Sequence, residues 1–151
     1  MSEDLRSLVA PTEVARHLRP VLLKLNRELR RETAAFGVTG GQAALLNMIR
    51  TSPGIGVREL AARERIAPAS MSVSVARLEK AGYVKRTADP LDRRRQALRV
   101  TEDGERILRA VRTRRTVWLA SRLSELPREK LEAVYNAIEP LTDLLAEEDR
   151  L

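Results

Sequence analysis

The residues with the most distinctive chemistry are the cations between positions 85 and 99. This stretch holds six basic residues and only two acids. Two short β-prone segments, 82–86 and 96–101, flank the turn-forming run 89–92, so the arginines at 93–95 are expected at the tip of a hairpin. Because a hairpin tip projects from its domain, these long cationic side chains could reach phosphates or a narrow groove.

The basic hairpin follows two short helical segments. Apolar spacing predicts one helix from Val57 to about Arg63, then a break at 66–68. A second helix is expected from Pro68, which suits a first helical turn, to Ala81, with Gly82 as its left-handed stop. The order helix, turn, helix and basic hairpin is typical of a winged helix that binds DNA.

Helical patterns also flank this region. A first helix is expected over 12–34, and Thr39 is placed to cap a second helix that ends at 52–54. After the hairpin, Thr101 caps a fifth helix, and Pro127 opens a sixth with Pro140 as an internal break. The expected fold class is mainly α, an α+β winged helix of six helices with a small β-hairpin wing.

The first and last of these helices carry wide apolar stripes that one subunit does not obviously cover. The economical explanation is a homodimer in which the N- and C-terminal helices of two subunits interlock. The alternative is a helix pair that packs on its own domain. The residues expected at the dimer interface are Leu18, Leu22, Leu131, Ile138, Leu141 and Leu145.

The charge is strongly positive and unevenly distributed. The net charge of +7 and the pI of about 10.7 favour a polyanionic partner. Residues 124–151 hold eight acids and three bases, a net charge of −5, so the first 123 residues carry +12. This asymmetry fits a phosphate-binding body with an acidic C-terminal element.

The composition excludes several other classes. The chain has no cysteine and one histidine, His17, which excludes disulfides, thiolate nucleophiles, cysteine-ligated zinc and any histidine-based metal site or Ser–His pair of normal layout. We therefore expect no enzyme activity, no cofactor and no metal. The acidic N-terminus at 1–4 and the absence of a membrane-length apolar run predict a cytoplasmic protein without a membrane partner.

At this point the chain resembles the MarR family of transcriptional regulators over nearly its whole length. The matching positions are Thr39, Gln42, Leu46, Val57, Leu60, Ala61, Pro68, Ser72, Leu78, Glu79, Gly82, Val84, Asp89-Pro90-x-Asp92-x-Arg94, Leu98, Thr101 and Gly104. The resemblance implies a single domain over 1–151, with a winged helix-turn-helix core at 38–101 and dimerisation helices at 1–37 and 102–151. It further implies a homodimer that binds a pseudo-palindromic DNA operator, usually as a repressor.

The predicted recognition helix begins with small side chains, which let its backbone approach the major groove, and with hydroxyls that can bond phosphates or base edges. Val73 stands where family members often place Arg or Gln, so Val73, Met71 or Ala69 could contact a thymine methyl instead. Arg77, one turn deeper, is expected on a phosphate. The residues of this helix predicted to contact DNA are Pro68, Ala69, Ser70, Met71, Ser72, Val73, Ser74 and Arg77.

In the hairpin, the resemblance assigns Arg94 to the minor groove, with Asp92 orienting it through a side-chain hydrogen bond. A planar guanidinium fits a narrow A·T-rich groove, and a nearby carboxylate can fix its rotamer. The neighbouring arginines would lie along the phosphates, and the first strand would supply backbone clamps. The wing residues predicted to contact DNA are Lys85, Arg86, Asp92, Arg93, Arg94 and Arg95.

Two questions stay open at this level. The resemblance implies a ligand pocket where the dimerisation helices meet the winged core, and Arg16, Arg19 and Arg27 favour a small aromatic acid as effector. The rival interpretation is an architectural or RNA-binding basic protein without sequence choice, because basic charge alone would serve it. A regulator should prefer its operator over random DNA by a factor on the order of a thousand or more.

Overall fold

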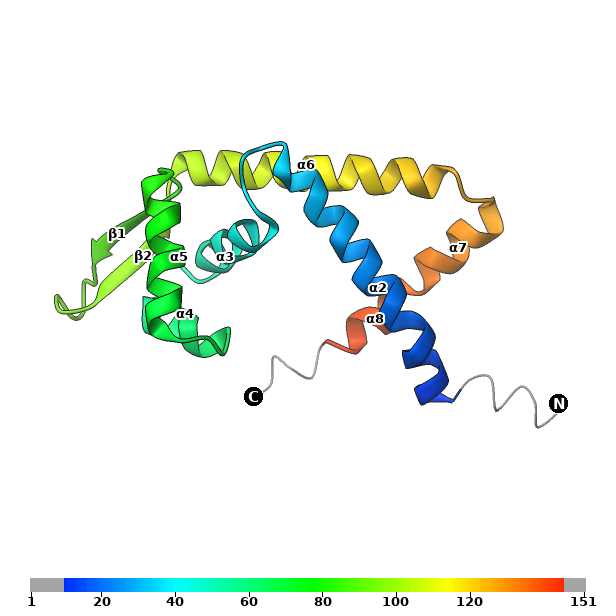
Figure 1. Ribbon diagram of the computed structural model, residues 1–151, viewed down its shortest axis with the longest axis horizontal. Helices are drawn as coiled ribbons and strands as arrows, with labels where there is room; N and C mark the ends of the chain where they lie inside the picture. The colour runs from blue at the N-terminus through cyan, green and yellow to red at the C-terminus, as the bar shows by residue number, and fades with distance from the viewer. Residues whose placement is uncertain (1–9, 146–151) are drawn as a thin grey trace. The chain divides into compact units, whose positions relative to one another are not determined.

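The structure is a computed structural model that describes residues 10–145 (Figure 1). The acidic N-terminal residues 1–4 and the C-terminal acids Glu147, Glu148 and Asp149 lie outside this range. The helices are α2 (Pro11–Ala34), α3 (Gly40–Thr51), α4 (Val57–Arg63), α5 (Pro68–Lys80), α6 (Glu102–Ser124), α7 (Arg128–Asn136) and α8 (Ile138–Asp143). The strands are β1 (Val84–Ala88) and β2 (Gln96–Val100), which form an antiparallel pair. The mainly helical fold with a hairpin wing is confirmed.

The chain forms two compact units, divided after Arg115. In the first unit, one apolar core joins α3, α4, α5, the hairpin and the start of α6. Leu46, Leu60, Val75 and Leu98 come from four different elements, and each is 0% exposed. Because α3, α4, α5 and the hairpin all bury apolar side chains in this one core, the two short helices and the hairpin are packed in one arrangement.

Local signals in the sequence set the helix ends. The Thr39 hydroxyl accepts a hydrogen bond from the Gln42 amide at 3.1 Å, and the Gln42 side chain accepts one from the Thr39 amide at 2.8 Å. This capping box satisfies two of the donors that a helix start leaves free. Pro68 occupies the first turn of α5, and Gly82, with φ of +80°, follows its last turn. These predicted boundaries are confirmed.

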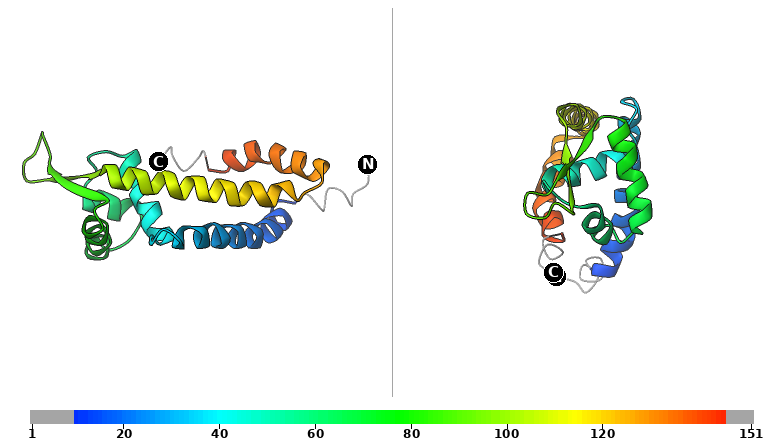
Figure 2. Two further views of the ribbon diagram at one scale, coloured as in Figure 1. Left: turned by 90° about the horizontal axis from the view of Figure 1, so that it is seen from above. Right: turned by 90° about the vertical axis from the view of Figure 1, so that its left-hand side faces the viewer.

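The wing is anchored at its base and extends away from α3–α5 (Figures 1 and 2). Val84 pairs with Val100 and Ala88 with Gln96, which leaves the run 89–95 as the tip. The loop between α3 and α4 adds two hydrogen bonds to β2, because Leu98 donates to the Ile55 carbonyl at 3.0 Å and accepts from the Gly54 amide at 3.1 Å. The base of the hairpin is therefore held on both edges of β2.

The second unit differs from the sequence prediction in one detail. The predicted sixth helix is two segments, α7 and α8, and the break lies at Ala137 rather than at Pro140. Proline cannot donate to the carbonyl of Asn136, four residues earlier, and its ring crowds that carbonyl. The helix consequently breaks one turn before the proline.

The junction between α5, the wing and α6 depends on Thr101. Its hydroxyl donates to the Gly82 carbonyl at 2.5 Å and accepts from the Gly104 amide at 3.1 Å, which caps α6. Gly104 itself lies against the chain, since a Cβ atom there would come within 3.0 Å of the Tyr83 carbonyl oxygen and the Val100 side chain. A glycine is required at this position for close packing rather than for an unusual φ angle.

We therefore predict that Gly104→Ala destabilises the protein by about 1–3 kcal/mol, because the added methyl group must displace backbone. An alanine in an open helical position normally stabilises relative to glycine by roughly 0.5–1 kcal/mol. Gly41→Ala in the first turn of α3 is the matched control, since its nearest neighbour would be the Thr39 hydroxyl at 3.9 Å. Urea unfolding measures both, and equal midpoints for the two variants would contradict the packing account.

Candidate nucleic-acid interface

The α5 helix presents two opposite faces. Met71, Val75 and Leu78 recur at helical spacing and are 0–1% exposed in the core. On the other side Val73 is 54% exposed, and Ala69 is exposed one turn before it. The face directed to solvent is consequently built from small and apolar groups in its first two turns, with Arg77 exposed at its end.

The structure changes the role of one predicted contact. Met71 is 1% exposed and packs in the apolar core, so the expectation that its side chain could meet a thymine methyl is wrong. It occupies the core because the buried stripe of α5 runs through 71, 75 and 78. Pro68, Ala69 and Val73 are exposed, and Val75 and Leu78 are buried in the core.

The three serines of α5 are not equivalent. Ser70 is exposed, whereas Ser72 and Ser74 are half-buried. The Ser74 hydroxyl donates to the Ser70 carbonyl at 3.1 Å, so its proton is used within the helix. Ser70 therefore offers the most accessible hydroxyl of this face.

Two aspartates fold the backbone of the wing tip. The Asp89 carboxylate accepts from the Leu91 amide at 2.8 Å, and the Asp92 carboxylate accepts from the Arg94 amide at 3.0 Å. The Asp89 amide also donates to the Arg95 carbonyl at 3.0 Å and closes the tip. Side-chain turns of this kind hold a loop without a regular ladder.

The role of Asp92 therefore differs from the prediction. The sequence predicts that its carboxylate orients the Arg94 guanidinium, but in the structure it binds the Arg94 backbone amide. Arg93, Arg94 and Arg95 are all exposed, and none takes part in an ion pair within residues 10–145. The turn therefore carries three exposed guanidinium groups, and none of them has a carboxylate oxygen within 4.0 Å in residues 10–145.

Arg86 of β1 forms an ion pair with a residue of α5. Its Nε atom donates to a Glu79 carboxylate oxygen at 2.9 Å, and both side chains are about 30% exposed. This pair links β1 to the last turns of α5, so Arg86 positions the wing relative to the helix. Glu79 was not predicted to act here, although it is among the positions that carry the family resemblance. Lys85, one residue earlier on β1, is exposed.

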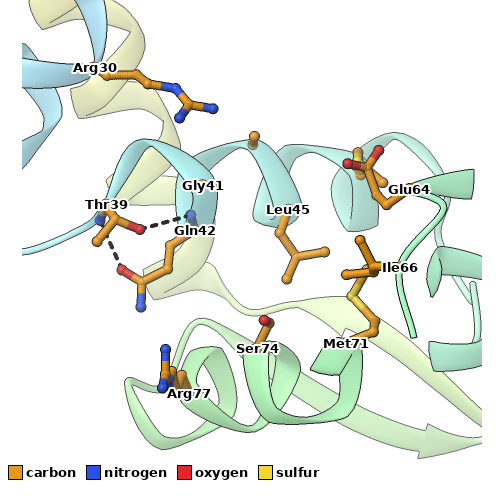
Figure 3. A pocket seen from close by; sticks show the side chains of 12 residues that line it. Arg30, Thr39, Gly41, Gln42, Leu45, Glu64, Ile66, Met71, Ser74 and Arg77 are labelled. Carbon is orange, nitrogen blue, oxygen red and sulfur yellow. Dashed lines mark hydrogen bonds between the residues drawn. The ribbon is translucent and has the colours of Figure 1, made fainter. Parts of the chain in front are cut away.

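A pocket of about 320 Å³ lies between α3, the α4–α5 turn and α5, with one residue of α2 at its rim (Figure 3). Leu45, Met48, Ile66 and Met71 give it an apolar lining. Its polar lining residues are Arg30, Thr39, Gln42, Glu64, Ser74 and Arg77. The cavity is large enough for a single-ring ligand and opens beside the exposed face of α5.

The cations of this pocket are not those predicted from the first helix. Arg16 pairs with Glu13 at 2.8 Å, and the arginine at the rim is Arg30. The aliphatic stem of Arg30 lies against Gly40, where a Cβ atom would come 2.6 Å from its Cγ. This contact depends on the approach of α2 to α3, which apolar periodicity does not reveal.

Arg115, also in the first unit, lies close enough to Arg30 for the two positive charges to interact. Burial lowers the pKa of the Arg115 guanidinium, and the like charge of Arg30 lowers it further. Arg115 donates to the Leu29 carbonyl at 3.2 Å, and Arg114 pairs with Glu32 at 2.8 Å. These contacts attach α6 to the end of α2, beside the pocket.

The terminal helices leave much apolar surface open. Leu22, Leu131, Ile138 and Leu145 are 39–66% exposed, whereas Leu18 and Leu141 are half-buried. Neither α7 nor α8 contains a buried residue, and Thr33 is the one buried residue of α2. Tyr135 of α7 is 73% exposed.

Other kinds of site find no support in the described part of the chain. Within residues 10–145, no three His, Asp or Glu side chains gather closely enough to hold a metal ion. No helix in the same range has the length and apolar character needed to cross a membrane.

Comparison with known proteins identifies the relatives of this chain. The MarR family model matches residues 36–95. An HTH-type transcriptional regulator of Mycobacterium bovis is 30% identical over 140 residues, which cover 93% of this chain and 98% of the relative. A transcriptional regulator from Thermotoga maritima has a crystal structure with a TM-score of 0.75 and 28% identity, covering 93% of this chain and 99% of that one.

The crystal structure of MarR has a TM-score of 0.69 and 26% identity, over 87% of this chain and 92% of that one. Both structures extend the likeness well beyond the hairpin and its helices. The chain belongs to the MarR family of winged helix-turn-helix transcriptional regulators.

Proposed function

We propose that this protein is a sequence-specific repressor that binds a pseudo-palindromic DNA operator as a homodimer. Each subunit would place α5 in the major groove and the wing in the neighbouring minor groove. The observation that carries the proposal is the fixed wing tip, where Arg93, Arg94 and Arg95 have no acidic partner within residues 10–145. The Arg86–Glu79 pair holds this tip in a set relation to α5.

Electrostatics supports the assignment of the exposed wing and α5 cations to DNA phosphates and to the minor groove. Phosphates dominate the affinity of proteins for DNA, and contacts to base edges supply the choice of sequence. Arg93, Arg95, Lys85 and Arg77 are exposed cations on the wing and α5 and suit phosphates. Arg94 at the centre of the tip suits a narrow A·T-rich minor groove, whose negative potential attracts a planar guanidinium.

The dimer is proposed from the terminal helices, 1–37 and 102–151, which flank the winged core at 38–101. The α7 and α8 helices expose Leu131 and Ile138 and contain no buried residue, and Leu145, just after α8, is exposed as well. Apolar surface of this kind is normally covered by a partner. A second copy related by a two-fold axis would cover it and would present two recognition helices to two half-sites. Occupation of a promoter by such a dimer would exclude polymerase, which is why we propose repression.

The pocket beside α5 suggests how the DNA complex could be released. Its two arginines, against one glutamate, favour an anion, and its apolar lining favours a ring, so we propose a small aromatic acid as effector. Arg77 would bind either this anion or a DNA phosphate. Such a ligand would bind the DNA-free protein more tightly than the DNA-bound protein. It would therefore lower the affinity for DNA, with a coupling free energy of about 1–3 kcal/mol.

For Arg94 we predict a loss of operator affinity in Arg94→Ala, concentrated on operators with A·T-rich wing positions. The operator is first selected from a random DNA library, and affinities are then measured by fluorescence anisotropy. Arg94→Lys is the matched control, because it keeps the charge but lacks the planar fork. It should retain binding to random DNA while losing most of the preference for A·T pairs.

If Arg94→Lys discriminated among these operators as the parent does, Arg94 would be a phosphate contact and the minor-groove assignment would be wrong. A parent protein that bound selected and random DNA equally would support the rival interpretation, a basic protein without sequence choice. A regulator should show a ratio on the order of a thousand or more.

For the effector we predict that salicylate, titrated into the preformed operator complex, lowers operator affinity by roughly 5- to 150-fold at saturation. Binding at high micromolar to millimolar concentration corresponds to about 4–6 kcal/mol. Arg30→Met should weaken this response, since methionine keeps the stem that packs on Gly40 and removes the charge. If calorimetry showed that salicylate binds the protein but operator affinity did not change, the proposed ligand switch would be wrong.

A further inference from the structure

The exposed face of α5 has an unusual composition for a surface that reads bases. From Pro68 to Ala76 the helix contains no arginine, lysine, asparagine, glutamine or acid. These are the side chains that form the specific paired hydrogen bonds with guanine, adenine or cytosine edges in the major groove. Hydroxyls and alkyl groups are all that the first nine residues of α5 can offer to DNA.

Val73 is the largest exposed apolar side chain among these first nine residues of α5. It lies opposite the buried stripe of Met71, Val75 and Leu78 and is 54% exposed, whereas those three are 0–1% exposed. Ala69 and Ala76, one turn to either side at helical spacing, are exposed and small, so they leave Val73 as the most prominent side chain of this face. The helix thus presents a short apolar ridge with its branched methyl groups at the centre.

The surroundings of this ridge fit DNA. Arg77 and Lys80 follow it on the same side of α5, and both are exposed cations. On the linked wing the exposed tip arginines add further positive charge. An apolar strip bordered by cations complements a groove whose walls are phosphates, and it fits an acidic protein surface less well because nothing polar pairs along its centre.

We propose that α5 selects its operator through thymine methyl groups, with Val73 as the residue that determines specificity. The inference rests on the proposed function and names the DNA feature that the recognition helix reads. Thymine is the base that carries a methyl group in the major groove. Contact with Val73 would bury this methyl, whereas a G·C pair at the same place would leave polar groups facing an alkyl side chain without partners.

The test uses the full-length protein and its library-selected operator. Thymines in the half-sites are replaced one at a time by deoxyuridine, which removes only the methyl group and keeps the base pair. At the positions that face α5, operator affinity should fall about three- to fivefold for each methyl contacted, the effect expected for one buried methyl group. Thymines at the wing positions should show no such loss.

Two variants assign the effect to its side chain. Val73→Ala should weaken binding to the thymine operator and be insensitive to deoxyuridine at the contacted position, so the two changes are not additive. Arg77→Ala is the control and should lower affinity for every sequence alike while leaving the deoxyuridine effect intact. Because Val73 is exposed, equal melting temperatures of parent and Val73→Ala are expected and exclude a folding defect.

Three results would overturn the inference and leave the proposed function standing. They are a selected operator without thymine opposite α5, an operator whose affinity is unchanged by deoxyuridine, and a deoxyuridine effect of full size in Val73→Ala. The last would mean that the methyl acts through DNA shape. If no sequence is selected above random DNA, the proposed function itself fails, and the inference fails with it.

Discussion

The junction of α5, the wing and α6 depends on the hydroxyl group of Thr101. Thr101 joins the Gly82 carbonyl, at the end of α5, to the Gly104 amide, in the first turn of α6, and its own amide donates to the Tyr83 carbonyl at 2.9 Å. Three elements meet there: the helix proposed to face DNA, the hairpin, and the long helix that leads to the terminal segments. These three hydrogen bonds tie the first turn of α6 to the end of α5 and to the base of the wing.

Charge is distributed over this frame in a consistent way. Cations that hold the structure together have partners, as Arg86 has Glu79 and Arg114 has Glu32. The wing-tip arginines have none within residues 10–145, and the tip is folded by aspartates that bind backbone amides. The carboxylates thereby shape the loop without occupying the guanidinium groups, which stay available for phosphates.

The elements of the fold could be predicted from the sequence because their signals are local. Thr39 with Gln42, Pro68 and Gly82 act within one or two turns of their own positions. The site was less predictable, because its details depend on packing between distant segments. The burial of Met71 follows from which face of α5 meets the core, and the Arg86–Glu79 pair and the Arg30 rim join residues from different elements. The helix break was predicted at Pro140 but lies about one turn earlier, at Ala137, because a proline disturbs the carbonyl four residues before it.

We propose that the two winged cores of a dimer read one operator together, with a set spacing between their recognition helices. Inserting about five base pairs between the half-sites of the selected operator turns them to opposite faces of the DNA, since a helical turn is about 10–10.5 base pairs. We predict that this insertion lowers the affinity to nearly that of a single half-site, measured by fluorescence anisotropy with the parent protein. Unchanged affinity after the insertion would show that the two half-sites are not read together and would contradict the account.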